Sequence, residues 1–386
     1  MFYRKKSFSL RSFSLALPIA LLSAFLDGAR LAGAHSDAAS VGHLSNQAAT
    51  PVAEAALAAL PSVLRTRAAA LPRGAAKAAE PTSSAKSASS LWHAKEIRGI
   101  YISRYQVTGS ARESEIRDRV RYYKSQGINT IIHGVWGNGC PMYKSEVMRQ
   151  TFDMDSCLNA FQEDWLDWLI DEAHKNDMEV HAYFEKGIKL DRDSPIFQYA
   201  KANGWFVPGV DRTYEGIEHY LLDVDNTEVS DFFAAISAEF VQHYPGIDAV
   251  QWDDYLGYHS DLPGSENRTS SLTRFVQRLQ ATVEQANPNV SFDLCHHNPY
   301  WSGRYFAADW RNWNADRAFI QVYNDNNFYD ELQYAESYAG IAITENQVHR
   351  LNDLLRNDKI KSILIFPSQG NPEAALELVS RYTSAQ

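Results

Sequence analysis

From about residue 96 onward, short runs of β-branched and aromatic residues alternate with longer segments in which apolar residues recur every three or four positions. The short runs predict eight strands, at residues 96–103, 129–135, 178–184, 249–253, 290–295, 318–323, 340–343 and 362–366. The longer segments predict a helix after each strand, at residues 112–126, 161–176, 227–243, 272–286, 305–313 (irregular), 327–338, 345–356 and 372–382. Such alternation is typical of a parallel sheet with crossover helices.

Eight strand and helix units in about 290 residues have the size of a (β/α)8 TIM barrel, which is the fold we predict. A doubly wound open sheet is the alternative. It is disfavoured because residues 104–109 (RYQVTG), which follow the first strand, lack the glycine-rich phosphate loop of that fold.

The first 92 residues differ from the rest of the chain. Residues 1–34 combine a basic start, an apolar run at 13–26 and a small-residue cleavage pattern, which are typical of a signal peptide and of a secreted or periplasmic protein. An uncleaved membrane anchor is the alternative, although the run is shorter than the roughly 20 residues that span a bilayer. We expect no membrane span after signal cleavage. Residues 35–92 are rich in Ala, Ser and Pro and predict a disordered linker, followed by the folded domain at 93–386.

Charge divides at the same point. The first 92 residues carry 10 Lys or Arg and 4 Asp or Glu, whereas the remainder carries 27 and 43. So acidic a domain is a poor binder of nucleic acid, because phosphate affinity depends on clusters of Lys and Arg. A neutral or cationic substrate is easier to accommodate. The three Cys residues leave two interpretations open, a Cys140–Cys157 bridge or three buried thiols.

In a TIM barrel the catalytic residues stand on the loops after the strands. Acids, amides and aromatic residues recur there, as a sugar site requires: carboxylates for proton transfer, amides for hydroxyl groups and ring faces for the apolar side of a pyranose. The candidates for contact with substrate are Arg104, Trp136, Tyr255, His297, Asn298, Trp301, Tyr323 and Asp325 after the strands, and His181 and Trp252 within them.

Asp253 and Asp254 form the sharpest local signal, because two carboxylates directly after a buried strand repel each other and lose hydration. Since side chains alternate along a strand, we expect one to point over the barrel mouth and the other to hold the loop or a neighbouring Arg. A pair that only shapes the loop is the competing interpretation. Glu185 is the preferred second catalytic carboxyl group, because its strand neighbours that of Asp253. Asp325 and Glu345 are the alternatives, although Glu345 is more typical of a first-turn helix carboxylate.

Histidine does not indicate a metal site. His181 lies inside a strand, where a hydrogen-bonded core residue is the usual role, and His297 is better placed to donate to a substrate hydroxyl. The chain has no HxH, HExxH or CxxC spacing, so we predict no metal and no other cofactor. A metal-dependent hydrolase that joins these His residues to Asp253 is a minor alternative.

Several motifs follow one another in a fixed order: EIRG (96–99), GINT (127–130), MYKS (142–145), VHAYF (180–184), LDVDNTEV (222–229), IDAVQWDDY (247–255), NP (298–299) and QVY (321–323). Over most of residues 95–370 the sequence therefore resembles the glycosyl-hydrolase-like 10 family, secreted bacterial proteins with a TIM-barrel domain. The resemblance implies that Asp253 and Asp254 are the centre of the site and that His181 and Tyr323 belong to it. The family usually has Asn where this chain has Glu185.

Together these observations predict a glycoside hydrolase that cleaves a bacterial cell-surface or extracellular polysaccharide by acid/base chemistry between carboxyl groups, without a cofactor. Trp252, Tyr255, Trp301 and Tyr323 would line its subsites. The competing class is a catalytically inactive barrel that only binds carbohydrate, because a fold does not certify an activity.

Overall fold

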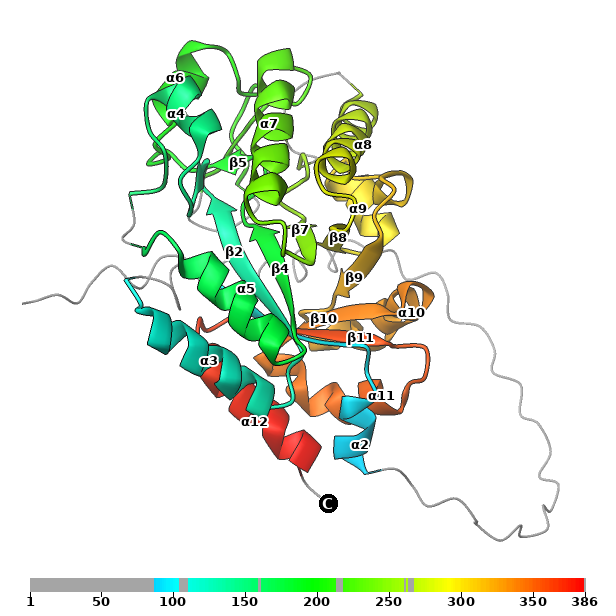
Figure 1. The fold of residues 1–386 in the computed structure, drawn as a ribbon. Coiled ribbons are helices and arrows are strands. Elements are labelled where there is room, and N and C mark those ends of the chain that lie inside the picture. Colours follow the sequence, from blue (N-terminus) through cyan, green and yellow to red (C-terminus); the bar gives the residue numbers. More distant parts are fainter. Residues whose placement is uncertain are drawn as a thin grey trace, which may run out of the picture. The chain divides into compact units, whose positions relative to one another are not determined.

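The computed structural model describes residues 87–103, 110–158, 161–212, 218–259, 262 and 267–384. Eight parallel strands follow one another around a closed barrel, in which the first strand, β1 (Ile97–Ile102), pairs with both the second, β2 (Thr130–Gly137), and the last, β11 (Ser362–Phe366). Figure 1 shows the strands at the centre of the fold. In barrel order they are β1 (Ile97–Ile102), β2 (Thr130–Gly137), β4 (Glu179–Phe184), β7 (Ala249–Asp253), β8 (Ser291–His296), β9 (Arg317–Gln321), β10 (Gly340–Thr344) and β11 (Ser362–Phe366). The predicted TIM barrel is confirmed.

Helices cover the outside of this barrel (Figure 1). The long ones lie within a few residues of their predicted positions: α3 (Glu113–Ser125), α5 (Trp165–Lys175), α7 (Thr227–His243), α8 (Arg268–Ala286), α10 (Phe328–Tyr338) and α12 (Pro372–Ser384). The predicted helix at 345–356 begins as a 3-10 helix (Glu345–Arg350) and continues as α11 (Leu351–Arg356). The irregular helix predicted at 305–313 is wrong. The helix in this region, α9 (Pro299–Tyr305), ends where the predicted one was to begin, and only a single 3-10 turn (Trp310–Asn312) follows.

The elements that the pattern missed are short. They are α2 (Ala88–His93), α4 (Glu146–Phe152), α6 (Phe197–Ala202), β3 (Cys140–Pro141) and the β5–β6 pair (Lys189–Leu190 and Tyr220–Leu221). Segments of two to seven residues are too brief to show a hydrophobic period. The β5–β6 pair belongs to the long connection between β4 and α7.

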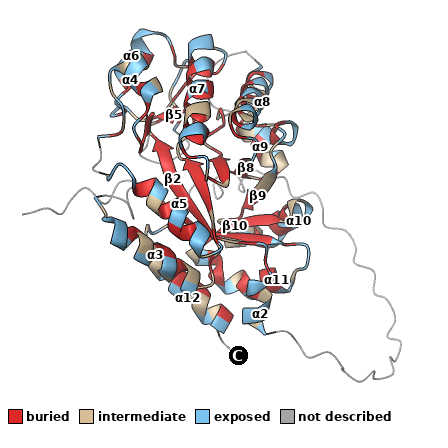
Figure 2. Cartoon of the chain, in the orientation of Figure 1, coloured by how far each residue is buried: buried red, intermediate tan, exposed pale blue. Residues whose placement is uncertain are grey.

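Side chains along the strands alternate between two packed layers, and the strands are buried on both faces (Figure 2). Outward-facing side chains pack against the helices, whereas the barrel interior is filled by Ile97, Tyr101, Ile132, Tyr183, Cys295, Phe319, Ala342 and Leu364. Gly99 also faces inward, and a Cβ there would lie 2.5 Å from Leu364 Cδ2 and 2.7 Å from Ile132 Cδ1. Because inward-facing and outward-facing residues alternate along each strand, only every second side chain can reach the barrel mouth.

The helix α2 straddles the position after residue 92 at which the folded domain was expected to begin. Its Trp92 is buried and packs close to Gly127, so α2 packs against the barrel domain although most of it lies within the expected linker. Residues 1–86, with the expected signal peptide and most of that linker, lie outside the described residues. Cys140 and Cys157 form a disulfide, and Cys295 is a buried thiol. In the described part of the chain, no helix is both long enough and apolar enough to cross a membrane.

Candidate active site

Asp253 is the last residue of β7, and its side chain lies inside the barrel mouth, where it is almost fully buried. One carboxyl oxygen, Oδ1, accepts a hydrogen bond of 2.9 Å from the backbone N–H of Tyr255. The other, Oδ2, accepts one from the hydroxyl of Tyr183 on the neighbouring strand β4. One oxygen is thus oriented by the loop after β7 and the other by the adjacent strand β4.

Asp254 follows the end of β7, so the alternation of strand side chains no longer applies to it. Its carboxyl group is also buried, and Oδ1 accepts a 3.1 Å hydrogen bond from the side-chain amide of Gln321 at the end of β9. His297 Nε2 lies 3.8 Å from Oδ2. The expectation that one Asp points over the mouth while the other holds the loop or an Arg agrees with the structure in one respect, because Asp253 holds the loop through the N–H of Tyr255. It differs in another respect, because both carboxyl groups contact barrel residues at the mouth: Tyr183 for Asp253 and Gln321 for Asp254.

The two carboxyl groups have opposite electrostatic environments. Burial, followed by the charge of Asp254, raises the pKa of Asp253 well above its ordinary value. Burial would also raise the pKa of Asp254, but the charges of His297, His296 and Lys189 and the hydrogen bond from Gln321 bring it below its ordinary value. Burial lowers the pKa of both histidines, that of His296 to about 3. When the environments of two neighbouring carboxyl groups move their pKa values apart in this way, the proton belongs to the group with the raised pKa, Asp253, and the negative charge to the other, Asp254.

Three tyrosine side chains line the barrel interior and its mouth near the two carboxyl groups. Tyr101 donates a hydrogen bond to Gln251 Oε1, and its ring contacts that of Tyr183 with centroids 5.5 Å apart. Tyr323 stacks on Phe366 above the same interior. Burial raises the pKa of Tyr101, Tyr183 and Tyr323 well above the ordinary value, so all three remain protonated hydrogen-bond donors.

The long connection after β4 supplies one wall. Glu185 is half-buried, and its charge adds to the raised pKa of Asp253. Gly187 has a φ of 43°, and a Cβ there would lie 2.8 Å from the backbone oxygen of Tyr255, so glycine lets this connection pack against the loop after β7. Lys189 is fully buried, with Nζ 3.1 Å from Oδ2 of the equally buried Asp211 and 4.8 Å from the ring centroid of Tyr255.

The structure brings together part of the predicted set. Asp253, Asp254, Tyr255, His297 and Tyr323 surround one mouth, with Glu185 close enough for its charge to act on Asp253. The His297 ring stacks on Phe306 at 5.0 Å.

Two predicted indoles face away from this mouth. Trp252 stacks on Phe184 at 4.5 Å, and Trp136 packs against Phe232 and Phe233 of α7. Both are buried in the layer between strands and helices, because residues next to an inward-facing strand position point outward. Their assignment to substrate binding is corrected to core packing.

Three further candidates are occupied by structural contacts. Asn298 caps α9 by accepting from the N–H groups of Tyr300 and Trp301, and its amide donates to both carboxyl oxygens of Glu331. Trp301 stacks on Tyr305 within α9 at 4.4 Å. Asp325 pairs with His349 at 3.0 Å and with Arg350 at 3.2 Å.

The alternative carboxylate Glu345 also has a structural role, because it accepts hydrogen bonds from the N–H groups of Ser368 and Gln369 and from the Ser368 hydroxyl. It thereby holds the loop after β11, in addition to standing at the start of a 3-10 helix. This position agrees with the expectation that Glu345 is a carboxylate in the first turn of a helix.

His181 lies at the opposite end of the barrel from the Asp pair. It is fully buried near the amino ends of the strands, 2.8 Å from Glu179, 3.5 Å from Asp293 and 3.3 Å from Arg317. It is therefore not brought to the mouth, which corrects its assignment to substrate binding. Arg104 lies outside the described residues.

The sequence analysis missed Tyr183, Gln251 and Gln321. Each stands two residues before a position that it had singled out: Glu185, Asp253 and Tyr323, respectively. The two-residue period of a strand was therefore the signal that could have found them. In the described part of the chain, no group of three or more His, Cys, Asp or Glu side chains is arranged to hold a metal ion.

Comparison with known proteins supports the motif-based resemblance. The glycosyl hydrolase-like 10 family model matches residues 96–274, so the predicted resemblance is confirmed over that segment. Glycosyl hydrolase DigH of Escherichia coli K12 is 24% identical over 254 residues, which cover 57% of this chain and 53% of the relative. The protein of the same name in Shigella flexneri gives the same values. The chain thus spans about half the length of the curated relatives it matches.

Solved structures with a similar arrangement include two carbohydrate-active proteins. A Paenibacillus cycloisomaltooligosaccharide glucanotransferase has a TM-score of 0.47 and 15% identity, over 65% of this chain and 38% of that one. An α-amylase from Lactobacillus plantarum has a TM-score of 0.47 and 10% identity, over 76% and 81%.

Proposed function

We propose that the chain is a glycoside hydrolase that cleaves a bacterial cell-surface or extracellular polysaccharide, with Asp253 and Asp254 as its acid/base pair. The observation that carries this proposal is the opposite shift in pKa of two adjacent, buried carboxyl groups at the carboxyl ends of barrel strands. Glycoside hydrolysis needs one carboxyl group that donates a proton and another that is ionised. The match to a glycosyl hydrolase-like family supports the same reaction class.

In this proposal Asp253, protonated, donates its proton to the glycosidic oxygen as the bond to the anomeric carbon breaks. Asp254, ionised, stabilises the positive charge that develops on the sugar ring. Water then attacks the anomeric carbon and loses a proton to the carboxyl pair, which restores the starting state. Tyr255, His297 and Tyr323 provide donors and ring faces for the sugar. The signal-peptide pattern of residues 1–34 supports the proposal that this activity lies outside the cytoplasm.

The test is product analysis by mass spectrometry after the full chain has been incubated with a panel of bacterial polysaccharides. We expect cleavage of at least one polymer, lost in Asp253→Asn and Asp254→Asn and kept in Asp118→Asn, which alters a 71% exposed carboxylate on α3. Binding without cleavage would favour the inactive carbohydrate-binding barrel. Activity that a chelator abolishes would favour a metal-dependent hydrolase.

A further inference from the structure

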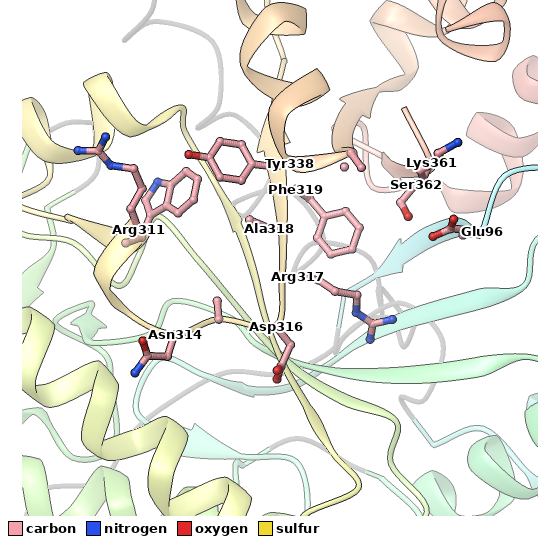
Figure 3. Close-up of a pocket in the computed structure, with 14 residues that line it drawn as sticks. Glu96, Arg311, Asn314, Asp316, Arg317, Ala318, Phe319, Tyr338, Lys361 and Ser362 are labelled. Carbon is pink, nitrogen blue, oxygen red and sulfur yellow. The ribbon is translucent and has the colours of Figure 1, made fainter. Parts of the chain in front are cut away.

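Two adjoining clefts lie beside α9 and α10, away from the Asp pair. The smaller, of about 340 Å³, is lined by Pro299, Tyr300, Arg311, Tyr334, Ser337 and Tyr338. The larger, of about 490 Å³, shares Arg311 and Tyr338 with it and continues past Arg317 to Glu96 and Lys361 (Figure 3). We refer to the two clefts together as the α9–α10 groove.

The groove runs between the two ends of the barrel. Pro299 and Tyr300 follow the carboxyl end of β8 within four residues, whereas Arg317 is the first residue of β9 and Lys361 immediately precedes β11. One end of the groove therefore begins close in the chain to His297, which lies beside Asp254. The other end opens at the amino ends of the strands.

Hydrogen bonds connect residues that line the groove to the candidate active site. The Trp310 indole, which lines the larger cleft, donates to the backbone oxygen of His297 at 3.0 Å and to the Ser302 hydroxyl at 2.9 Å. Asn298 joins α9 to α10 through its two hydrogen bonds to Glu331. A ligand bound along this wall would thus be held at a fixed distance from the Asp pair.

Exposed aromatic rings are concentrated here. Among the described residues, five large apolar side chains are strongly exposed, and three of them belong to α9 and α10: Tyr300, Tyr329 and Tyr334. Tyr300 and Tyr334 line the groove and are 52% and 39% exposed. The Arg304 guanidinium donates to the Tyr300 hydroxyl at 2.9 Å and so orients that ring. Clustered exposed aromatic side chains mark binding surfaces, since they do not contribute to the core.

The lining of the smaller cleft indicates what would bind. It consists of tyrosine rings, a proline ring, a guanidinium and a hydroxyl group, and no aliphatic Leu, Ile, Val or Met is among the residues that line it. A sugar ring presents an apolar C–H face that stacks on tyrosine and a rim of hydroxyl groups that accept from Arg and donate to Ser. An apolar helix or a lipid chain would require aliphatic contacts instead. We propose that the α9–α10 groove is a second glycan-binding site, which holds a distal stretch of the polysaccharide whose cleavage is proposed above.

The test is affinity electrophoresis of the full chain in gels that contain a neutral polymer (dextran), a cationic one (partly de-N-acetylated chitosan) or an anionic one (hyaluronan). All proteins carry Asp253→Asn so that no polymer is cut. We expect at least one polymer to retard the chain, and Tyr300→Ala/Tyr334→Ala to weaken the apparent Kd about tenfold, as the loss of two ring contacts implies. Tyr329→Ala is the matched control, because this ring is 53% exposed on α10 but does not line either cleft.

The proposal is overturned if no polymer retards the chain, if the double variant binds as the parent does, or if Tyr329→Ala loses as much affinity. It is also overturned if the two tyrosines instead support a concentration-dependent dimer in gel filtration. Because this inference rests on the proposed hydrolase activity, cleavage is measured separately with Asp253 intact. Tyrosine-dependent retardation without cleavage would refute the hydrolase and retain the glycan site, whereas cleavage without such retardation would refute the glycan site alone.

Discussion

Lys189 and Asp211 form an ion pair that water does not reach, with Nζ 3.1 Å from Oδ2 and both side chains fully buried. Removing such charges from water costs several kcal/mol per ion, and the attraction between them offsets this cost only while both are present. We therefore predict that Lys189→Met and Asp211→Leu each lower the free energy of unfolding by about 3–5 kcal/mol. At about 2–4 °C per kcal/mol, the melting temperature should fall by roughly 6–20 °C.

The double variant Lys189→Met/Asp211→Leu buries neither charge, and replacement of a buried pair by apolar side chains is often neutral or stabilising. We expect its free energy of unfolding to return to within about 1 kcal/mol of the parent value, measured by urea unfolding monitored with circular dichroism. Arg212→Met is the control, because it breaks an exposed pair with Glu218 and should cost no more than about 1 kcal/mol. A double variant as unstable as either single variant would refute the reasoning.

The same double variant tests the electrostatics of the site. Because the charge of Lys189 helps to lower the pKa of Asp254, its removal raises that pKa, and Asp254 then needs a higher pH to ionise. The acidic limb of the pH dependence of kcat/KM should therefore move to higher pH while the fold is retained. An unchanged acidic limb would mean that Lys189 does not act on Asp254, the ionised carboxylate of the proposed mechanism.

Four further predictions concern the site and the start of the domain. Asp253→Asn and Asp254→Asn should each lower kcat about 10²–10⁴-fold. Because folding raises the pKa of Asp253, this residue destabilises the folded state at any pH above the ordinary pKa of Asp. Asp253→Asn should therefore raise the melting temperature at pH 7, but not at a pH below that ordinary pKa. A lower melting temperature at pH 7 would contradict this. Glu185→Gln should shift the alkaline limb of the pH profile to lower pH with only a modest loss of rate, because Glu185 raises the pKa of Asp253; a loss as large as that of Asp253→Asn would instead make Glu185 the second catalytic carboxyl group. Trp92→Ala should lower the free energy of unfolding by about 3–5 kcal/mol, and unchanged urea unfolding would show that α2 is not part of the cooperative fold.

The barrel was predictable because its strands and helices are long enough to show their periods and alternate without interruption. The strand pattern alone placed the Asp253–Asp254 pair at the carboxyl end of its strand, without deciding which side chain faces the mouth. The two-residue period also directs Trp252 away from the mouth, and the strand boundary puts His181 near the amino end of its strand. The pattern therefore contradicts the assignment of both residues to substrate binding. Lys189 was beyond such reasoning, because its partner Asp211 lies 22 residues away in a connection without a hydrophobic period, and no local signal pairs them.

The barrel contains buried charges at both of its ends, and their arrangements differ. At the amino ends of the strands, Arg317 Nε donates to both oxygens of Asp293 at 3.0 Å, and Glu179 accepts from His181 and Arg317. Each carboxylate there has a cationic or hydrogen-bonding partner: Asp293 from the neighbouring strand β9, and Glu179 from its own strand and from β9 across the barrel. Such a closed set restrains the strands relative to one another and is typical of the stabilising end of a TIM barrel.

At the carboxyl ends, Asp253, Asp254 and Glu185 bring three carboxyl groups together, and the nearby Lys189 is already paired with Asp211. This excess of carboxyl groups weakens the folded protein, because it keeps one of them protonated against its intrinsic tendency. A neutral sugar in the ground state gains little from it. A sugar ring that becomes positively charged as its glycosidic bond breaks gains more, since the negative charge is already oriented in a site with little water. Under the proposed function, the arrangement would favour the transition state over the substrate, which is the physical requirement for catalysis. A merely structural use of this carboxyl cluster would leave its cost to the folded protein without such a gain.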